Sequence, residues 1–121
     1  GRSTVEFCDI FTKNKEIIHV KPKQNSSVLS HLFSQGHVAG ELLLFDEEFR
    51  NKVRAKLDHG FKGLIPSTNP KPSDYKIIYA IITKNTTQEI PFFSKVTLNF
   101  HTRVLEGYGY KVYLNKIKNT Q

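Results

Sequence analysis

The sequence has no methionine and no tryptophan, and it holds a single cysteine, Cys8, among 121 residues. One cysteine excludes an internal disulfide and any zinc site built from cysteines, and it fits a protein of the reducing cytoplasm. Because free cysteine is among the residue types most often buried, we expect Cys8 to be a small buried hydrophobe. The sequence therefore predicts a cytoplasmic domain that is stabilised by its apolar core.

Long apolar runs are also missing. The longest, IIYAII at residues 77–82, is far shorter than the roughly 20 residues that cross a bilayer. No signal peptide with a basic start and an apolar middle is present, so we expect no membrane partner. Without a methionine at its start, the chain is expected to be a fragment of a larger protein. Residues 1–3 would then be a tag remnant and residues 4–121 a single domain, with other domains of the parent protein as partners.

Positive charge is plentiful, since 18 Lys and Arg outnumber 11 Asp and Glu and leave a net charge of +7. A balance this basic favours an anionic partner, and nucleic acid comes first. In residues 47–57 apolar side chains recur every four positions and face the core, so the basic residues between them are expected on the outer side. We predict nucleic-acid contacts from Lys23, Arg50 and Arg54.

Two β-rich segments open the chain, VEFCDIF at 5–11 and EIIHVK at 16–21, and the polar turn TKNK between them predicts an antiparallel hairpin. The asparagine of the turn tolerates left-handed geometry. Apolar spacing predicts a helix at 28–35 that Gly36 ends, followed by helical segments at 38–45 and 47–57. Further elements are predicted as strands at 75–83 and 110–117, with a helix from Pro91 to the glycines at 107 and 109 between them.

This order predicts a mixed α/β fold of the α+β kind, in which a mixed sheet of about four strands is flanked by helices in β-β-α-α-β-α-β order. Residues 75–83 are apolar almost throughout, which suits a central strand covered on both faces. In the last helix, an apolar face is formed by Phe93, Val96, Phe100 and Val104. The strand at 110–117 alternates in polarity and is expected near an edge.

The hairpin carries the residues most suggestive of chemistry. An acid on the first strand, an x-Lys on the second and a following helix resemble the PD-(D/E)XK, or restriction-endonuclease-like, nucleases over residues 5–36. The resemblance implies that Asp9 holds a divalent metal, Mg²⁺ or Mn²⁺, that Lys21 orients the attacking water, and that Gln35 supports the site. His19 stands where the second acid belongs and shares a strand face with Lys21. Histidine is a poor magnesium ligand and a better one for manganese, zinc or nickel.

The register of the hairpin decides which acid joins this site. If Asn14 centres a three-residue loop, Asp9 lies opposite His19 and Lys21 shares their face. A loop of two or four residues instead places Glu6 opposite Lys21 and turns Asp9 away, because a one-residue slip exchanges the faces. Asp9 is the favoured metal ligand and Glu6 the alternative. In the second register Glu6 and Lys21 form an ordinary cross-strand ion pair.

The amino-acid sequences of several segments show a second resemblance. EFCDIF, IIHVKPKQNSSVLSHLFSQGHVAGELL, YAIIT, IPFFSKVTL and GYKVYLNKI resemble the C-terminal part of a sporadically distributed bacterial protein family of uncharacterised function. Its members are much longer, and their patchy distribution implies a setting of mobile elements and phage defence. Two functions follow as hypotheses: a metal-dependent phosphodiesterase or nuclease with a variant D…HxK site, or a non-catalytic basic module that binds nucleic acid or a neighbouring domain.

Overall fold

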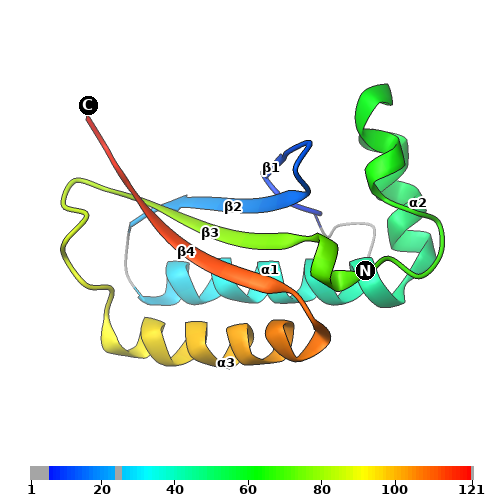
Figure 1. The fold of residues 1–121 in the computed structure, drawn as a ribbon. Coiled ribbons are helices and arrows are strands. Elements are labelled where there is room, and N and C mark those ends of the chain that lie inside the picture. Colours follow the sequence, from blue (N-terminus) through cyan, green and yellow to red (C-terminus); the bar gives the residue numbers. More distant parts are fainter. Residues whose placement is uncertain (1–5, 24–25, 121) are drawn as a thin grey trace.

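A computed structural model describes residues 6–23 and 26–120 of the chain, so the tag remnant expected at residues 1–3 lies outside the described residues. The mixed α/β class and the β-β-α-α-β-α-β order are confirmed (Figure 1). The elements are β1 (Ile10–Phe11), β2 (Glu16–Pro22), α1 (Ser26–Phe45), α2 (Glu47–Lys56), the 3₁₀ helices η2 (His59–Leu64) and η3 (Pro72–Asp74), β3 (Lys76–Thr83), α3 (Phe92–Tyr108) and β4 (Lys111–Lys118). None of the described helices is long and apolar enough to span a membrane.

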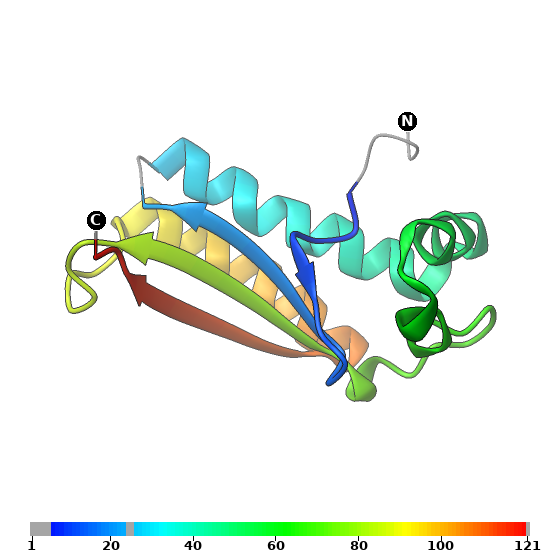
Figure 2. The same cartoon turned by 90° about the horizontal axis from the view of Figure 1, so that it is seen from above.

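The four strands form one mixed sheet in the order β1-β2-β3-β4. β1 is antiparallel to β2, whereas β2, β3 and β4 run parallel to one another. The connections from β2 to β3 and from β3 to β4 cross the sheet in the same direction. Because crossovers between parallel strands are nearly always right-handed, two such crossovers place their helices on the same face of the sheet. Accordingly, α1 and α3 lie together beneath the sheet in Figure 1, and Figure 2 shows the opposite face with no helix across it.

β3 is the centre of the core, as predicted, but helices cover only one of its faces in the described part of the chain. Ile77, Tyr79 and Ile81 point toward the helices and are fully buried. On the open face Ile78 and Ala80 are also buried, because side chains of the flanking strands pack beside them. The expectation of helical cover on both faces is therefore wrong for the described residues.

α1 is one continuous helix, so the prediction that a helix ends at Gly36 is wrong. A Cβ atom at residue 36 would lie 2.3 Å from the hydroxyl oxygen of Tyr79, and one at Gly40 would lie 2.9 Å from a methyl group of Leu105. These two glycines let α1 approach β3 and α3 more closely than any other residue would permit. The Tyr79 hydroxyl donates to the Phe33 carbonyl oxygen at 2.8 Å and joins strand to helix.

α3 turns a different face to the core from the one that its hydrophobic spacing indicates. Phe93, Val96 and Phe100 are between half and three-quarters exposed, while Ser94 and Leu105 are fully buried. The packed stripe is partly polar and meets α1 through pairs of small or polar side chains: Thr97 with Ser30, His101 with His37, and Tyr108 with Glu41. Hydrophobicity alone therefore selects the wrong stripe of this helix.

Candidate functional site

The β1–β2 hairpin takes the register of a three-residue loop. Ile10 pairs with Ile18, and the Thr12 amide donates to the Glu16 carbonyl oxygen at 3.1 Å to close the loop. Such loops place their last residue in the left-handed region, and here that residue is Lys15, with φ of 61°, rather than the predicted asparagine. Of the two registers open to the sequence, this is the one that brings Asp9 to the side of His19.

Asp9 lies immediately before the first strand, because β1 begins only at Ile10 and is much shorter than the predicted strand over residues 5–11. The Asp9 amide donates to the Ile18 carbonyl oxygen at 3.0 Å, so Asp9 and Ile10 both lie opposite Ile18, as in a β-bulge. Bulges re-aim side chains and are common beside active sites. The Asp9 carboxylate accepts the Val20 amide at 2.8 Å and so satisfies a strand donor that has no β1 partner.

A cavity of about 470 Å³ opens between this hairpin and α1. Its lining residues come from the segment before β1, from β2 and from one face of α1, and they are Glu6, Cys8, Asp9, His19, Lys21, His31, Ser34, Gln35 and Val38. The α1 members recur at three- and four-residue spacing, which places them on one side of the helix. All four predicted catalytic residues, Asp9, His19, Lys21 and Gln35, therefore meet at one hollow, together with the alternative acid Glu6.

His31 is the member that sequence reasoning underrated. Its place between Ser30 and Leu32 favours an interpretation as cover for the edge of the core over one that points it toward the hairpin, yet it lies one turn before Gln35 and lines the cavity. The available signal was its four-residue offset from Gln35, which predicts one helix face for both side chains.

His19 is the most deeply placed polar group of the cavity, with 4% of its surface exposed. Burial lowers its pKa from 6.5 to about 4, and the nearby Asp9 carboxylate opposes this with a smaller upward effect. Its ring lies 5.9 Å from that of Tyr79. Among buried side-chain polar atoms of the described residues, only His19 Nε2 and Ser94 Oγ lack a hydrogen-bond partner. An unpaired buried nitrogen costs stability, and His19 is also one of the residues that line the cavity.

Lys21 is the cation of the cavity. It is half-buried, and its side chain makes no hydrogen bond or ion pair with any described residue. The ordinary ion pair between Glu6 and Lys21 that the other register implied is therefore not formed. Lys21 can give all three of its ammonium donors to a ligand.

The donor set does not make a complete metal centre. No group of three or more His, Cys, Asp and Glu side chains in the described part of the chain is placed to hold an ion. Asp9 and His19 remain as two donors with different metal preferences. The side chains alone therefore do not fit a preformed Mg²⁺ or Mn²⁺ site.

Arg50 was expected on the outer side of its helix, and this is wrong. The side chain is 5% exposed, and its guanidinium donates to the carbonyl oxygens of Leu43 and Leu44 at 3.0 and 3.1 Å. It also reaches the Ser67 carbonyl oxygen at 2.9 Å. Since Leu43 and Leu44 lie in the last turn of α1, Arg50 donates to carbonyls of the kind that a helix end leaves without an intrahelical partner. Its donors are committed to the fold and are not available to phosphates.

The other two predicted nucleic-acid contacts differ from each other. Arg54 is half-buried and donates to the Ile65 carbonyl oxygen at 3.1 Å and to the side chain of Asn51, so both terminal nitrogens of its guanidinium are engaged. Lys23 directly follows β2 and is half-exposed, with a side chain that has no partner among the described residues. Lys23 keeps the freedom that a phosphate contact requires.

Comparison with known proteins assigns the chain to a family. The model of a family of unknown function, DUF6119, matches residues 1–118. The chain belongs to this family. Membership agrees with the resemblance to a family of uncharacterised function, and it brings no activity with it. No curated protein and no solved structure matches the chain, so any functional argument rests on the residues and their arrangement.

Proposed function

We propose that this DUF6119 domain binds the phosphodiester backbone of nucleic acid in the hairpin cavity and cleaves it there. The observation that carries the proposal is the convergence of Asp9, His19, Lys21 and Gln35 on one cavity. These four residues come from three different parts of the fold, namely the bend before β1, the strand β2 and the helix α1. Packing of the core does not by itself require them to surround a cavity. Perturbed titratable groups beside such a hollow are typical of functional sites.

Each side chain has a distinct part in this proposal. Lys21 supplies the charge that attracts a non-bridging phosphate oxygen. His19 is neutral at pH 7, because burial lowers its pKa to about 4. Its buried Nε2 has no hydrogen-bond partner among the described residues, and the proposal gives it one in the bound group. Gln35 and His31 supply further donors from α1. Lys23, just after β2, extends the positive potential along the backbone.

The finer assignments belong to the proposal as well. The hairpin, the x-Lys and the following helix support a restriction-endonuclease-like site that has lost its second carboxylate. A role in defence against phage or mobile elements rests on the resemblance of the family alone. No step is assigned to a metal ion, since the described side chains do not form a complete set of ligands.

The test combines binding and cleavage. Lys21→Ala is compared with Lys111→Ala, a matched control on an exposed edge-strand residue, using labelled duplex DNA and RNA at two salt concentrations. Plasmid and RNA are then incubated with each protein in EDTA, in Mg²⁺ and in Mn²⁺. We expect Lys21→Ala to lower affinity by roughly fivefold or more, as the loss of a charged hydrogen bond does, and to abolish cleavage, whereas Lys111→Ala behaves like the wild type.

Equal affinity and equal cleavage in the two variants would contradict the proposal. Binding that is insensitive to salt would contradict it too, because phosphate contacts release counterions and weaken steeply as salt rises. A salt-sensitive affinity lost in Lys21→Ala, without cleavage under any metal condition, would leave the binding function and remove the catalytic one.

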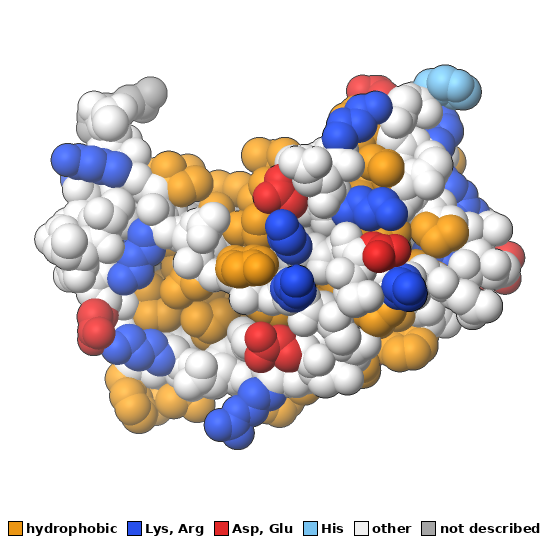
Figure 3. All heavy atoms as spheres, in the orientation of Figure 1, with side chains coloured by type: hydrophobic (Ala, Val, Ile, Leu, Met, Phe, Trp, Pro, Cys, Tyr) orange, Lys and Arg blue, Asp and Glu red, His pale blue; other side chains and the backbone are white. Residues whose placement is uncertain are grey.

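A second candidate is a non-catalytic module that binds nucleic acid or another domain. Two observations favour it: the Asp9 carboxylate already serves the Val20 amide, and apolar side chains of α3 and of the open sheet face are exposed, among them Phe93, Phe100 and Ile117. Figure 3 shows Lys and Arg spread over the face it presents rather than gathered in one patch, with hydrophobic side chains between them. The cleavage assays above separate this candidate from the first.

A further inference from the structure

A second cavity, of about 350 Å³, lies on the other side of the segment that precedes β1, against α2. It is lined by Glu6, Phe7, Cys8, Asp9, Phe11, Phe49, Lys52, Val53, Lys56 and Leu57. Three of these residues, Glu6, Cys8 and Asp9, line the hairpin cavity as well. The two cavities are therefore neighbours that share one wall.

The floor of this second cavity is aromatic. The Phe7 ring stands edge-on to those of Phe11 and Phe49, with centroids 5.1 and 6.5 Å apart. Val53 and Leu57 complete the apolar lining from α2. The shared wall adds Cys8, whose thiol stays protonated at neutral pH because burial raises its pKa to about 12. The interior is thus uncharged and suited to a flat apolar group.

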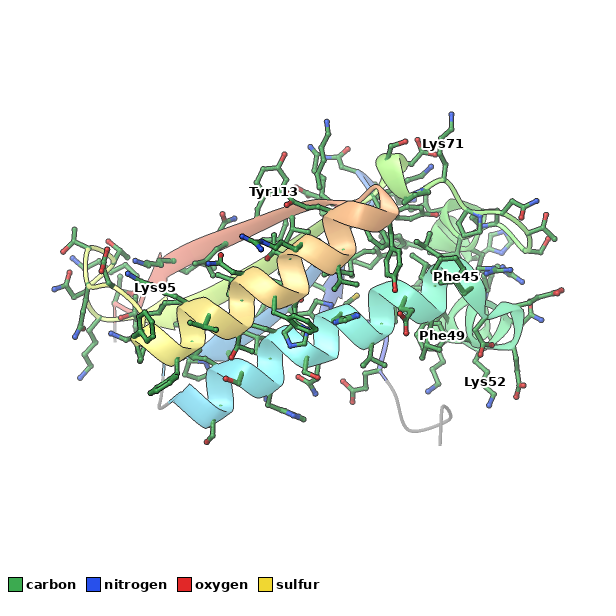
Figure 4. The ribbon with its side chains drawn as sticks, turned by 90° about the horizontal axis from the view of Figure 1, so that it is seen from below. Phe45, Phe49, Lys52, Lys71, Lys95 and Tyr113 are labelled. Atoms are coloured by element: carbon green, nitrogen blue, oxygen red, sulfur yellow. The ribbon has the colours of Figure 1, made fainter. Side chains whose placement is uncertain are left out.

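Charged side chains stand at the rim rather than in the interior. Lys52 and Lys56 are exposed and lie one turn apart on α2, and Figure 4 shows Lys52 beside Phe49 at the end of the molecule where α2 lies. Glu6 and Asp9 are exposed on the opposite wall. An occupant therefore meets cations from one side and hydrogen-bond acceptors from the other.

We propose that this cavity binds a nucleobase of the nucleic acid whose backbone lies in the hairpin cavity. The volume falls in the range of small-molecule sites, and bases stack on aromatic side chains whatever their sequence. The carboxylates of Glu6 and Asp9 accept hydrogen bonds from exocyclic amino groups, while Lys52 and Lys56 face the adjoining phosphates. Because the shared wall separates the two cavities by a few residues, neighbouring parts of one strand can occupy both.

This inference rests on the proposed function and names its substrate class. A base inside an apolar cavity cannot remain paired with a complementary strand, so the nucleic acid is either single-stranded or has a base turned out of its helix. The domain is then expected to prefer single strands or distorted duplexes to intact duplex.

The experiment uses two labelled single-stranded DNA oligonucleotides that differ only by one central abasic position. Affinities are measured for the wild type, Phe7→Ala, Lys56→Ala, Lys21→Ala and the control Lys71→Ala, whose side chain lies well apart from Lys52 in Figure 4 and lines neither cavity. We expect the wild type to bind the intact strand roughly fivefold or more tightly than the abasic strand, the effect of one stacked base. This ratio should fall toward one in Phe7→Ala and stay unchanged in Lys71→Ala.

A second measurement covers the case in which Phe7→Ala does not fold. Cytidine monophosphate and adenosine monophosphate are titrated into ¹⁵N-labelled wild type, and we expect amide shifts in residues 6–9 and 49–57 that Lys56→Ala weakens. An abasic ratio of one in the wild type, or nucleotide-induced shifts confined to other residues, overturns the base site. If Lys21→Ala still loses affinity in that case, the proposed function stands without it. Absence of binding to every oligonucleotide overturns both.

Discussion

The two sides of α1 meet the sheet in opposite ways. Toward β3 the helix is in tight contact, because Gly36 has no side chain to hold Tyr79 away. Toward the hairpin the same helix borders the cavity, which it lines with His31, Ser34, Gln35 and Val38. On the packed side two buried tyrosine hydroxyls have partners: that of Tyr79 donates to the Phe33 carbonyl oxygen and that of Tyr110 to the Gly40 carbonyl oxygen, the latter at 2.6 Å.

On the side of the cavity, His19 Nε2 and the ammonium of Lys21 have no partner among the residues that the structure describes. Buried polar groups in folded proteins are nearly always paired, so an unpaired group beside a hollow marks where a ligand can complete the network. The presence or absence of hydrogen-bond partners on the two sides of α1 thus distinguishes residues that stabilise the fold from residues that are available to a ligand.

The largest effect is expected on the packed side. Gly36→Ala places a Cβ atom 2.3 Å from the Tyr79 hydroxyl oxygen, and such overpacking costs about 1–3 kcal/mol. Urea unfolding should show this loss in free energy, and the double variant Gly36→Ala with Tyr79→Leu should recover part of it. Gly107→Ala is the matched control, because nothing lies within 4 Å of its position in α3. That variant should gain up to about 1 kcal/mol of helix propensity, so a similar loss in both variants would refute close packing at Gly36.

A smaller effect, of opposite sign, is expected on the cavity side. His19→Phe removes an unpaired buried nitrogen, so the free energy of unfolding at pH 7 should rise by about 1 kcal/mol while nucleic-acid binding falls. In the wild type, the pKa of His19 is lowered from 6.5 to about 4. The unfolded chain therefore binds a proton at this residue before the folded one does, so the stability of the wild type is unaffected by this residue's titration above pH 6.5 and decreases as the pH falls toward 4. Burial also lowers the pKa of His101, so the difference between the two proteins isolates His19.

That difference is measured by urea unfolding at several pH values between 4 and 7. His19→Phe should flatten the acid limb of the stability profile, and profiles of equal slope in the two proteins would show that His19 is not buried in its neutral form.

The smallest effect on stability is expected at Asp9. Asp9→Asn keeps a side-chain oxygen for the Val20 amide, so the free energy of unfolding should change by less than about 0.5 kcal/mol. The same change removes the carboxylate from the cavity and should abolish cleavage if the site is catalytic. Thermal unfolding and the plasmid assay check the two halves. A large loss of stability would assign Asp9 to the fold rather than to the site.

Much of the fold could be predicted because its signals are local. Such signals act within a few residues, and they include the strand composition at β2 and β3, Pro91 before α3 and the left-handed Gly109 after it. The prediction fails where the structure at a residue depends on a contact with a residue distant in the chain. Gly36 is a helix end by its local sequence, and only contact with Tyr79 makes it an interior position. Arg50 reads as a solvated basic residue until the end of α1 supplies its acceptors.

The candidate site follows the same rule. Period-two alternation placed His19 and Lys21 on one face, and loop length offered two registers, of which the three-residue loop is present. The choice between the registers depended on backbone geometry at Lys15 that no pattern specifies. The second cavity had no sequence signal, because Phe7 and Lys56 are joined only by the packing of α2 against the segment before β1.

The one-directional winding of the sheet has a consequence for where ligands can bind. Doubly wound α/β proteins open their ligand crevice at a topological switch point, where the direction of successive crossovers reverses. The strand order β2-β3-β4 contains no reversal, so this domain lacks that ready-made crevice within its described sheet. Its hollow arises from strand truncation instead, since β1 pairs over two residues and leaves the rest of β2 without a strand partner on that edge in the described chain. Lengthening β1 toward Glu6 would therefore be a way to erase the site while completing the sheet.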